Sequence, residues 1–294
     1  MVSVVCAVLI MQGCGIGQEH RPADGEVFWS GSYHELLRLV AIGDSAFFLS
    51  LGEDSEDTPS LFRLHPDGRP EFVWIPQVAC RGWLDLVGLV LVSTERADLI
   101  AHCDAEPDDE YTVFTFDASS GIPEVAAFAR YHAAPAAWDG TAFVGFLKPG
   151  TSPCGLSGGL VWVGGGGVLP RCAIPGAQPP ALWTGTDLLY GCPPTGEKVV
   201  NLCRGVPGGP SGAVVVSGFA EYDGVTVAGP DVVVAGQPGT GRPGVFRVSA
   251  TGMVERIATG VYKSPMVDRR TGEVLALKCD ERRGKCRSVV RLSR

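Results

Sequence analysis

The feature that most constrains this chain is a repeated arrangement of strand-like segments joined by tight turns. Six stretches read as an apolar strand, a turn rich in Gly and Asp, and a second apolar strand, and they begin at Val40, Leu91, Ala136, Leu182, Val225 and Pro265. A second strand–turn–strand stretch follows, as in SLFRLHPDGRPEFVWI and GVFRVSATGMVERIA. Helical periodicity is nearly absent, and we interpret the short run HELLRLV as part of a strand. The unit is therefore four antiparallel strands that recur every ~40–50 residues.

Units of this length and composition are typical of β-propeller blades. The sequence predicts an all-β fold in which residues 21–294 form one six-bladed β-propeller of four-stranded antiparallel blades. The last unit stops at SVVRLSR without a fourth strand, whereas DGEVFWSG precedes the first full unit without a partner. We expect these two segments to pair, so that the closing blade is shared between the N- and C-termini and its strand edges are covered. The alternative is a stack of separate β-domains.

The N-terminal segment has the composition of an export signal. Val2–Met11 is apolar but too short to span a bilayer as a helix, and the sequence MQGCG follows it. This segment resembles a bacterial lipoprotein signal, which implies that Cys14 is the lipidated first residue of the mature chain. We therefore interpret residues 1–20 as an export segment and tether. The predicted location is the bacterial cell envelope, on its periplasmic or extracellular face, and the alternative is a soluble secreted protein with a cleaved signal peptide.

The cysteines agree with an oxidising compartment. If Cys6 is removed with the signal and Cys14 carries lipid, an even number remains, as a disulfide framework requires. Their spacing favours pairing in sequence order, and the predicted disulfides are Cys80–Cys103, Cys154–Cys172, Cys192–Cys203 and Cys279–Cys286. Neither C-x-x-C redox motifs nor the close cysteine knuckles of zinc sites occur, so we predict no metal site and no cofactor.

Two sets of connections could carry a ligand. The loops between second and third strands are long and unlike one another, and several hold a cysteine or a cluster of acids, so we expect binding on that face. The connections between blades share an aromatic residue, often beside a polar one. The candidate ligand-face residues are Tyr33, His34, Trp83, Tyr131, His132, Tyr222, Asp223, Tyr262 and Lys263. The alternative, which we favour, is that the aromatic residues pack between neighbouring blades.

Short motifs with a chemical meaning are weak here. GLSGG places Ser157 in a G-x-S-x-G pattern, but no helix follows to form a nucleophile elbow. GTGRPG matches a dinucleotide-binding pattern, yet Pro243 and a strand follow where a helix is required. The acidic loops GEDSEDTPS and CDAEPDDEY lack the order of a calcium loop, so we interpret them as solvated charge.

The repeat length, the strand pattern and the split closing blade resemble six-bladed propellers of the TolB-like and gluconolactonase-like shape. Gluconolactonase-like enzymes hold a divalent metal in the central channel with Glu, Asn and Asp. Asn201 is the only asparagine of this chain, and no such set stands at matching strand positions, which argues against that activity. The signature motifs of the Trp-Asp and kelch repeat families are absent as well.

The leading hypothesis is a non-catalytic, monomeric binding scaffold at the cell envelope with a protein or glycan partner. Membrane contact would occur only through the lipid on Cys14. The alternative is a propeller hydrolase or lyase with a polar or metal site in the channel that includes Tyr131, His132 and Tyr222. A formal net charge of −8 argues against nucleic acid as a partner, because phosphate binding requires a basic surface.

Overall fold

The structure, a computed structural model, describes residues 25–31, 35–51, 60–74, 83–93, 95–104, 110–117, 124–128, 135–147, 152–163, 169–192, 199–209, 212–281 and 284–292. Its regular elements are antiparallel β-strands. No helix in the described ranges is long and apolar enough to cross a membrane. The predicted export segment, including Cys14, lies outside the described residues.

Three sheets have four strands that follow one another in sequence. The first contains β2 (Glu35–Ile42), β3 (Ser45–Leu51), β4 (Ser60–Leu64) and β5 (Pro70–Trp74). The second contains β6 (Trp83–Leu91), β7 (Arg96–Asp104), β8 (Glu110–Asp117) and β9 (Glu124–Phe128). The third contains β10 (Pro135–Trp138), β11 (Phe143–Leu147), β12 (Gly159–Trp162) and β13 (Arg171–Pro175).

A fourth sheet has seven strands and serves as two units. Its strands are β14 (Gln178–Trp183), β15 (Leu188–Cys192), β16 (Val200–Gly205), β17 (Ala213–Ala228), β18 (Asp231–Pro238), β19 (Gly244–Val248) and β20 (Val254–Thr259). The first part of β17 pairs with β16, and the part from Phe219 onward pairs with β18. The register with β18 shifts between Phe219 and Glu221 and again between Tyr222 and Gly224, and Gly218 has φ 87°, so the strand can bend from one sheet to the next.

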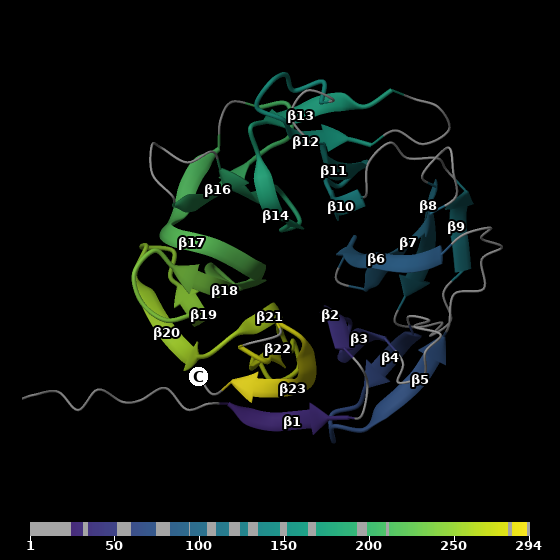
Figure 1. Cartoon of the computed structure of the whole chain (residues 1–294), viewed down its shortest axis with the longest axis vertical. Helices are drawn as coiled ribbons and strands as arrows, with labels where there is room; N and C mark the ends of the chain where they lie inside the picture. The colour runs from purple at the N-terminus through teal and green to yellow at the C-terminus, as the bar shows by residue number, and fades with distance from the viewer. Residues whose placement is uncertain are drawn as a thin grey trace, which may run out of the picture.

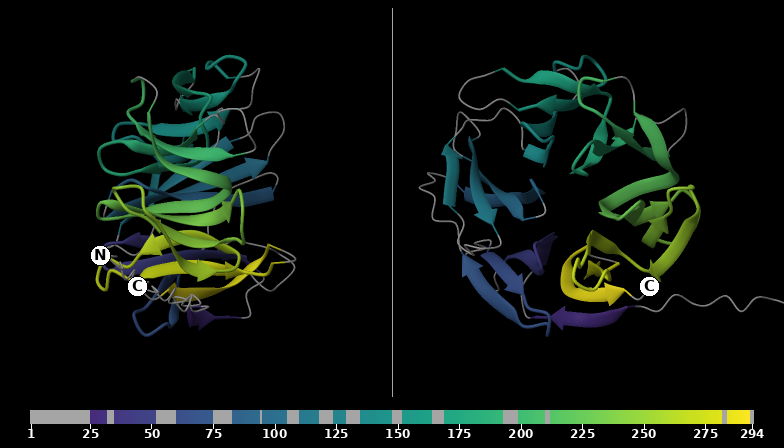
Figure 2. Two further views of the ribbon diagram at one scale, coloured as in Figure 1. Left: turned by 90° about the vertical axis from the view of Figure 1, so that its left-hand side faces the viewer. Right: turned by 180° about the vertical axis from the view of Figure 1, so that it is seen from behind.

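The last sheet is formed by both ends of the described chain. β1 (Glu26–Ser30) pairs with β23 (Cys286–Leu292), followed in the sheet by β22 (Val274–Cys279) and β21 (Tyr262–Val267). Glu26 lies opposite Arg291, and Ser30 lies opposite Ser288. The views of Figure 2 show β1 beside β23 from two further directions. This pairing confirms the predicted closing unit, in which a strand from the N-terminal side supplies the missing fourth strand.

The sheets stand around a common centre, with β2, β6, β10, β14 and β21 nearest to it (Figure 1). The innermost strands contact one another in a closed sequence: β2, β6, β10, β14, β17, β21 and again β2. We interpret this ring as six blades, with the seven-stranded sheet divided at β17. They are called blades 1 to 6 below, starting with the sheet of β2–β5 and ending with that of β21–β23 and β1.

The core lies between neighbouring blades. Adjacent side chains of a strand point to opposite faces, so Phe48 packs against blade 6 while Phe47 packs against blade 2. Both rings are fully buried. The same arrangement recurs at each of the other described junctions, where two adjacent blades contribute to one apolar cluster. A continuous apolar run such as AFFLSL is therefore compatible with a strand, because both faces of a blade are covered.

Candidate functional site

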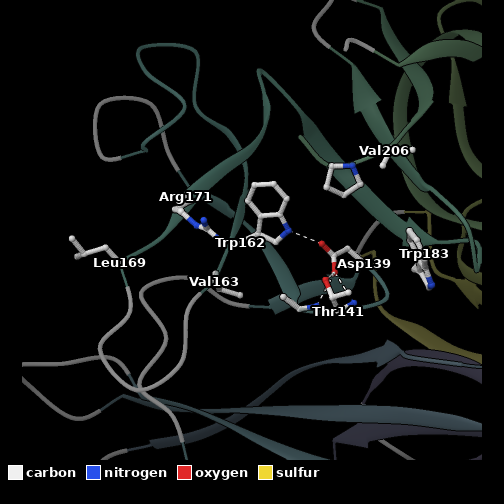
Figure 3. Close-up of a pocket in the computed structure, with 10 residues that line it drawn as sticks. Asp139, Thr141, Trp162, Val163, Leu169, Arg171, Trp183 and Val206 are labelled. Atoms are coloured by element: carbon white, nitrogen blue, oxygen red, sulfur yellow. Dashed lines mark hydrogen bonds between the residues drawn. The ribbon is translucent and has the colours of Figure 1, made fainter. Parts of the chain in front are cut away.

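A pocket of about 490 Å³ lies between blades 3 and 4, on the face of the short turns (Figure 3). This volume is within the range of small-ligand and side-chain pockets. Its lining comes from the β10–β11 turn, the ends of β12, β13 and β14, and the segment after β16. The lining residues are Asp139, Thr141, Ala142, Trp162, Val163, Leu169, Arg171, Trp183, Val206 and Pro207.

Asp139 fixes the indole of Trp162 at the centre of the pocket. Its carboxylate accepts hydrogen bonds from Trp162 Nε1 at 2.5 Å, from the backbone N–H groups of Thr141 at 2.9 Å and Ala142 at 2.7 Å, and from Thr141 Oγ1 at 2.9 Å. Burial alone would raise the pKa of Asp139, but these hydrogen bonds outweigh it and hold the pKa below its ordinary value. The carboxylate is thus ionised and already engaged, so its role is to position Trp162.

Arg171 lies beside the same indole. Its guanidinium carbon is 5.7 Å from the centre of the Trp162 ring, which is within the range of a cation–π contact. Figure 3 shows the guanidinium directed toward Trp162, with Leu169 beyond it. Within the described parts of the chain, Arg171 makes neither a hydrogen bond nor an ion pair. The pocket therefore has one cationic group whose charge is not matched by a carboxylate.

Two glycines allow the indoles to lie close to the backbone. A Cβ atom at Gly140, which has φ 97°, would be 3.0 Å from the ring of Trp183. A Cβ atom at Gly208, with φ 74°, would be 3.2 Å from the ring of Trp162. The turns of blades 3 and 4 thus present two indoles at one site, and a side chain at either glycine would crowd them.

The pocket occurs where blade 3 departs from the cross-strand pattern of blades 1, 5 and 6; the equivalent pairs are Thr115–Glu124 in blade 2 and Arg204–Ala213 in blade 4. In blades 1, 5 and 6, the third strand places an arginine opposite a glutamate of the fourth strand, and these cross-strand pairs are Arg63–Glu71, Arg247–Glu255 and Arg291–Glu26. The equivalent pair of blade 3 is Trp162–Arg171. An aromatic ring thus replaces the arginine, and a cation replaces the glutamate. This exchange opens an apolar surface and reverses the charge beside it.

Two apolar side chains of the pocket lining are well exposed. Leu169 and Val206 are 75% and 59% exposed, and exposed apolar side chains that gather at one pocket can mark an interaction site. Among the lining residues, Asp139 is saturated by donors and the Thr141 hydroxyl is engaged with it. Among the described lining residues, no nucleophile stands beside a base. The described residues also contain no group of three or more His, Cys, Asp or Glu side chains that could hold a metal ion.

The structure describes only some of the aromatic residues that the sequence predicts for the ligand face. Tyr33, His34, Tyr131 and His132 are outside the described residues, and Trp83 is described only as the first residue of β6. Tyr262 is 1% exposed and packs between blades 5 and 6.

Tyr222 lies in strand β17, where that strand passes from blade 4 to blade 5. Its ring stacks on Phe219, with ring centres 5.1 Å apart, and burial raises the pKa of its hydroxyl. The two tyrosines whose side chains are described thus fit the packing alternative.

Asp223 and Lys263 are close enough to interact across β17 and β21. Burial raises the pKa of Asp223, repulsion from Glu221 raises it further, and attraction to Lys263 lowers it. Lys263 Nζ donates a hydrogen bond to the Gly284 carbonyl at 3.0 Å. Lys263 is therefore partly engaged in holding the β22–β23 loop, and the two residues do not form a closed ion pair with each other.

Three of the predicted cysteine pairs are disulfides in the structure: Cys154–Cys172, Cys192–Cys203 and Cys279–Cys286. Cys80 of the fourth pair lies outside the described residues, and for Cys103 only its place in β7 is described. Ser157 lies in a turn that leads into strand β12, as expected of a glycine-rich loop.

Sequence reasoning missed the pocket residues Trp162, Arg171 and Trp183. The available signal was the third strand of each unit, where Trp162 replaces a recurring arginine. That signal becomes visible only when the repeats are compared position by position.

Comparison with known proteins gives the fold and little else. No family model and no curated protein matches the sequence. Among solved structures, the chain is similar to TolB from Acinetobacter baumannii, with a TM-score of 0.56 and 14% identity over 89% of this chain and 64% of TolB. The chain is a β-propeller.

A second similar structure is puromycin hydrolase complexed with PGG, with a TM-score of 0.50 and 14% identity over 88% of this chain and 54% of the hydrolase. The propeller thus spans less than two thirds of the length of either protein. At this level of identity the similarity concerns the fold alone. Any activity has to be argued from this chain's own residues.

Proposed function

We propose that this β-propeller is a non-catalytic binding module of the bacterial cell envelope that docks a protein partner in the pocket between blades 3 and 4. The observation that carries the proposal is the Trp162–Arg171 pair, which replaces the Arg–Glu pairs of blades 1, 5 and 6. A local departure from a repeated structural pattern, at a site with exposed apolar side chains, indicates a requirement other than folding.

The chemistry of the pocket favours a protein over a glycan. Leu169, Val206 and Pro207 contribute apolar surface without hydrogen-bonding side chains. A sugar would require several polar groups for its hydroxyls, but the carboxylate of Asp139 is already occupied by its own donors. An apolar side chain of a protein would instead fill the space between the indoles of Trp162 and Trp183.

Export is supported by the disulfides, because such bonds persist in oxidising compartments and are rare in the cytosol. The sequence MQGCG supports attachment through lipid on Cys14. Mass spectrometry of the protein from its host tests both points. Lipid on Cys14 and oxidised cysteines are expected, whereas free thiols would contradict an exported location.

Docking can be tested by photocrosslinking in the host. A photoreactive amino acid at Leu169 should capture a discrete partner, because this side chain is 75% exposed at the edge of the pocket. The matched control carries the same amino acid at Met253, which is 68% exposed near the start of β20 in blade 5.

The decisive variant is Trp162→Arg combined with Arg171→Glu, which gives blade 3 the pair found in blades 1, 5 and 6. The fold should tolerate it, since an arginine at position 162 can still donate to Asp139. Crosslinking from Leu169 should disappear in this variant. Crosslinking of equal strength in both proteins, or from Met253 as strongly as from Leu169, would overturn the proposed docking site.

A further inference from the structure

The geometry points to a more specific partner: a protein segment in which an aspartate or glutamate is adjacent to a large apolar residue. The carboxylate would bind Arg171, and the apolar side chain would lie between Trp162 and Trp183. This inference rests on the proposed function, because it assigns the chemistry of what occupies the same pocket.

The charge of Arg171 is not balanced by a carboxylate among the described residues. Three third-strand arginines of other blades have a carboxylate within ion-pair distance: Arg63 with Glu71 at 3.6 Å, Arg204 with Asp187 at 3.6 Å and Arg291 with Glu273 at 3.1 Å. Arg247 of blade 5 lies opposite Glu255 in the strand register without such an ion pair among the described residues. Arg171 has only the face of Trp162 in the described structure. A planar guanidinium beside an apolar surface is well suited to a carboxylate, which it can bind through two parallel hydrogen bonds.

The charge of the pocket lining does not suit a cationic segment. Among the described lining residues, Asp139 is the only carboxylate; three donors contact its Oδ1, and the Trp162 indole N–H donates to its Oδ2. A lysine or arginine of the partner would therefore meet the unmatched charge of Arg171 without gaining a free carboxylate. The local charge thus favours an anion, although the formal net charge of the whole chain is −8. Since the overall charge repels acidic segments, their selection would have to come from Arg171 itself.

The cationic and the apolar subsites lie on opposite sides of Trp162. Figure 3 shows Arg171 and Leu169 on one side of Trp162, with Trp183 and Val206 on the other. A bound segment that crosses the Trp162 ring would place a carboxylate at one end and an apolar group at the other. The indole is held by its hydrogen bond to Asp139, so the spacing of these subsites is fixed before binding.

Selection from a library of short displayed random peptides tests this inference. The library is selected on the wild-type protein and, in parallel, on Arg171→Glu, Arg171→Gln and the Trp162→Arg/Arg171→Glu variant, all checked for native near-UV circular dichroism. We expect wild-type binders enriched in Asp or Glu next to Trp, Phe, Leu or Ile. Binders of Arg171→Glu should carry Lys or Arg at that place.

A selected peptide then gives a quantitative check. Replacing its acidic residue with the amide should weaken binding about three- to fivefold, as for one solvent-exposed ion pair, and should have no effect on Arg171→Gln. Apolar binders without acidic enrichment, or the same sequences on wild type and Arg171→Glu, would overturn the carboxylate assignment while leaving the docking site intact. Failure of every peptide to distinguish wild type from the double variant would overturn the docking site as well.

Discussion

Trp162 and Arg171 are cross-strand neighbours on β12 and β13, with the guanidinium carbon of Arg171 5.7 Å from the centre of the Trp162 ring. The equivalent positions of blades 1, 5 and 6 hold an arginine and a glutamate. A blade can therefore fold with the Arg–Glu pair, and the pair of blade 3 is not required by the architecture. Its cost is an exposed apolar surface, which a docked partner would cover.

Asp139 should stabilise the native state mainly through the turn and the indole that it holds. We expect Asp139→Ala to lower the free energy of unfolding by about 1–3 kcal/mol, because four hydrogen bonds are lost and the part-buried donors of Ala142 and Trp162 are left without this acceptor. Urea unfolding followed by tryptophan fluorescence measures this. Asp67→Ala is the control, since Asp67 is also a turn aspartate but its Arg69 pair is exposed. Equal loss in both variants would contradict a special role for Asp139.

The same residue predicts the direction of a pH dependence. The folded-state pKa of Asp139 is below its ordinary value. The stabilisation that its ionised carboxylate gives to the native state is therefore complete above the unfolded-state pKa of about 3.9, and it is lost as the pH falls through the folded-state pKa. Stability should therefore fall below about pH 4 less steeply in Asp139→Ala than in wild type. If the stability of the two proteins falls equally steeply as the pH decreases, this prediction is wrong.

The ionised carboxylate of Asp223, in contrast, should destabilise the native state. Burial and the nearby Glu221 raise its pKa, so the ionised form is less favourable in the folded than in the unfolded state. Asp223→Asn should therefore raise Tm at neutral pH, and the gain should shrink as the pH falls through the raised folded-state pKa and disappear below the unfolded-state pKa of about 3.9. Calorimetry at several pH values tests this. A lower Tm at neutral pH would mean that attraction to Lys263 outweighs burial.

Two disulfides should have similar effects on stability but different effects on peptide binding. Cys279–Cys286 closes a short hairpin of blade 6, whereas Cys172 directly follows Arg171 on β13. Replacing either pair with alanine should lower the free energy of unfolding by roughly 2–4 kcal/mol. Only loss of Cys154–Cys172 should also weaken peptide binding, because it frees the strand that carries Arg171. Equal loss of binding in both variants would argue against this positioning role.

Much of the fold followed from local patterns. Turn residues between apolar strands predicted the hairpins, and the unpaired segment DGEVFWSG predicted the strand that closes the ring beside β23. Cysteines at the two ends of one hairpin predicted Cys279–Cys286, because paired strands bring such residues together. These inferences required only interactions within one blade or between the two chain ends.

The site depends on contacts that local patterns do not encode. Trp162 and Trp183 belong to different blades, and they share a pocket because the turns of both blades meet there. For Tyr222, the sequence could not separate a channel position from a packing position. The register shifts in β17 determine which way its ring points, and they direct it onto Phe219.

The most direct test of the docking site is nitrogen-15 NMR of the tryptophan indoles while the captured partner segment is added. The chain has 6 tryptophans, so each indole N–H can be assigned by substitution. We predict that the resonances of Trp162 and Trp183 shift in proportion to occupancy while those of Trp29 and Trp138 stay in place. Saturable binding that leaves Trp162 and Trp183 unmoved would contradict the proposed site.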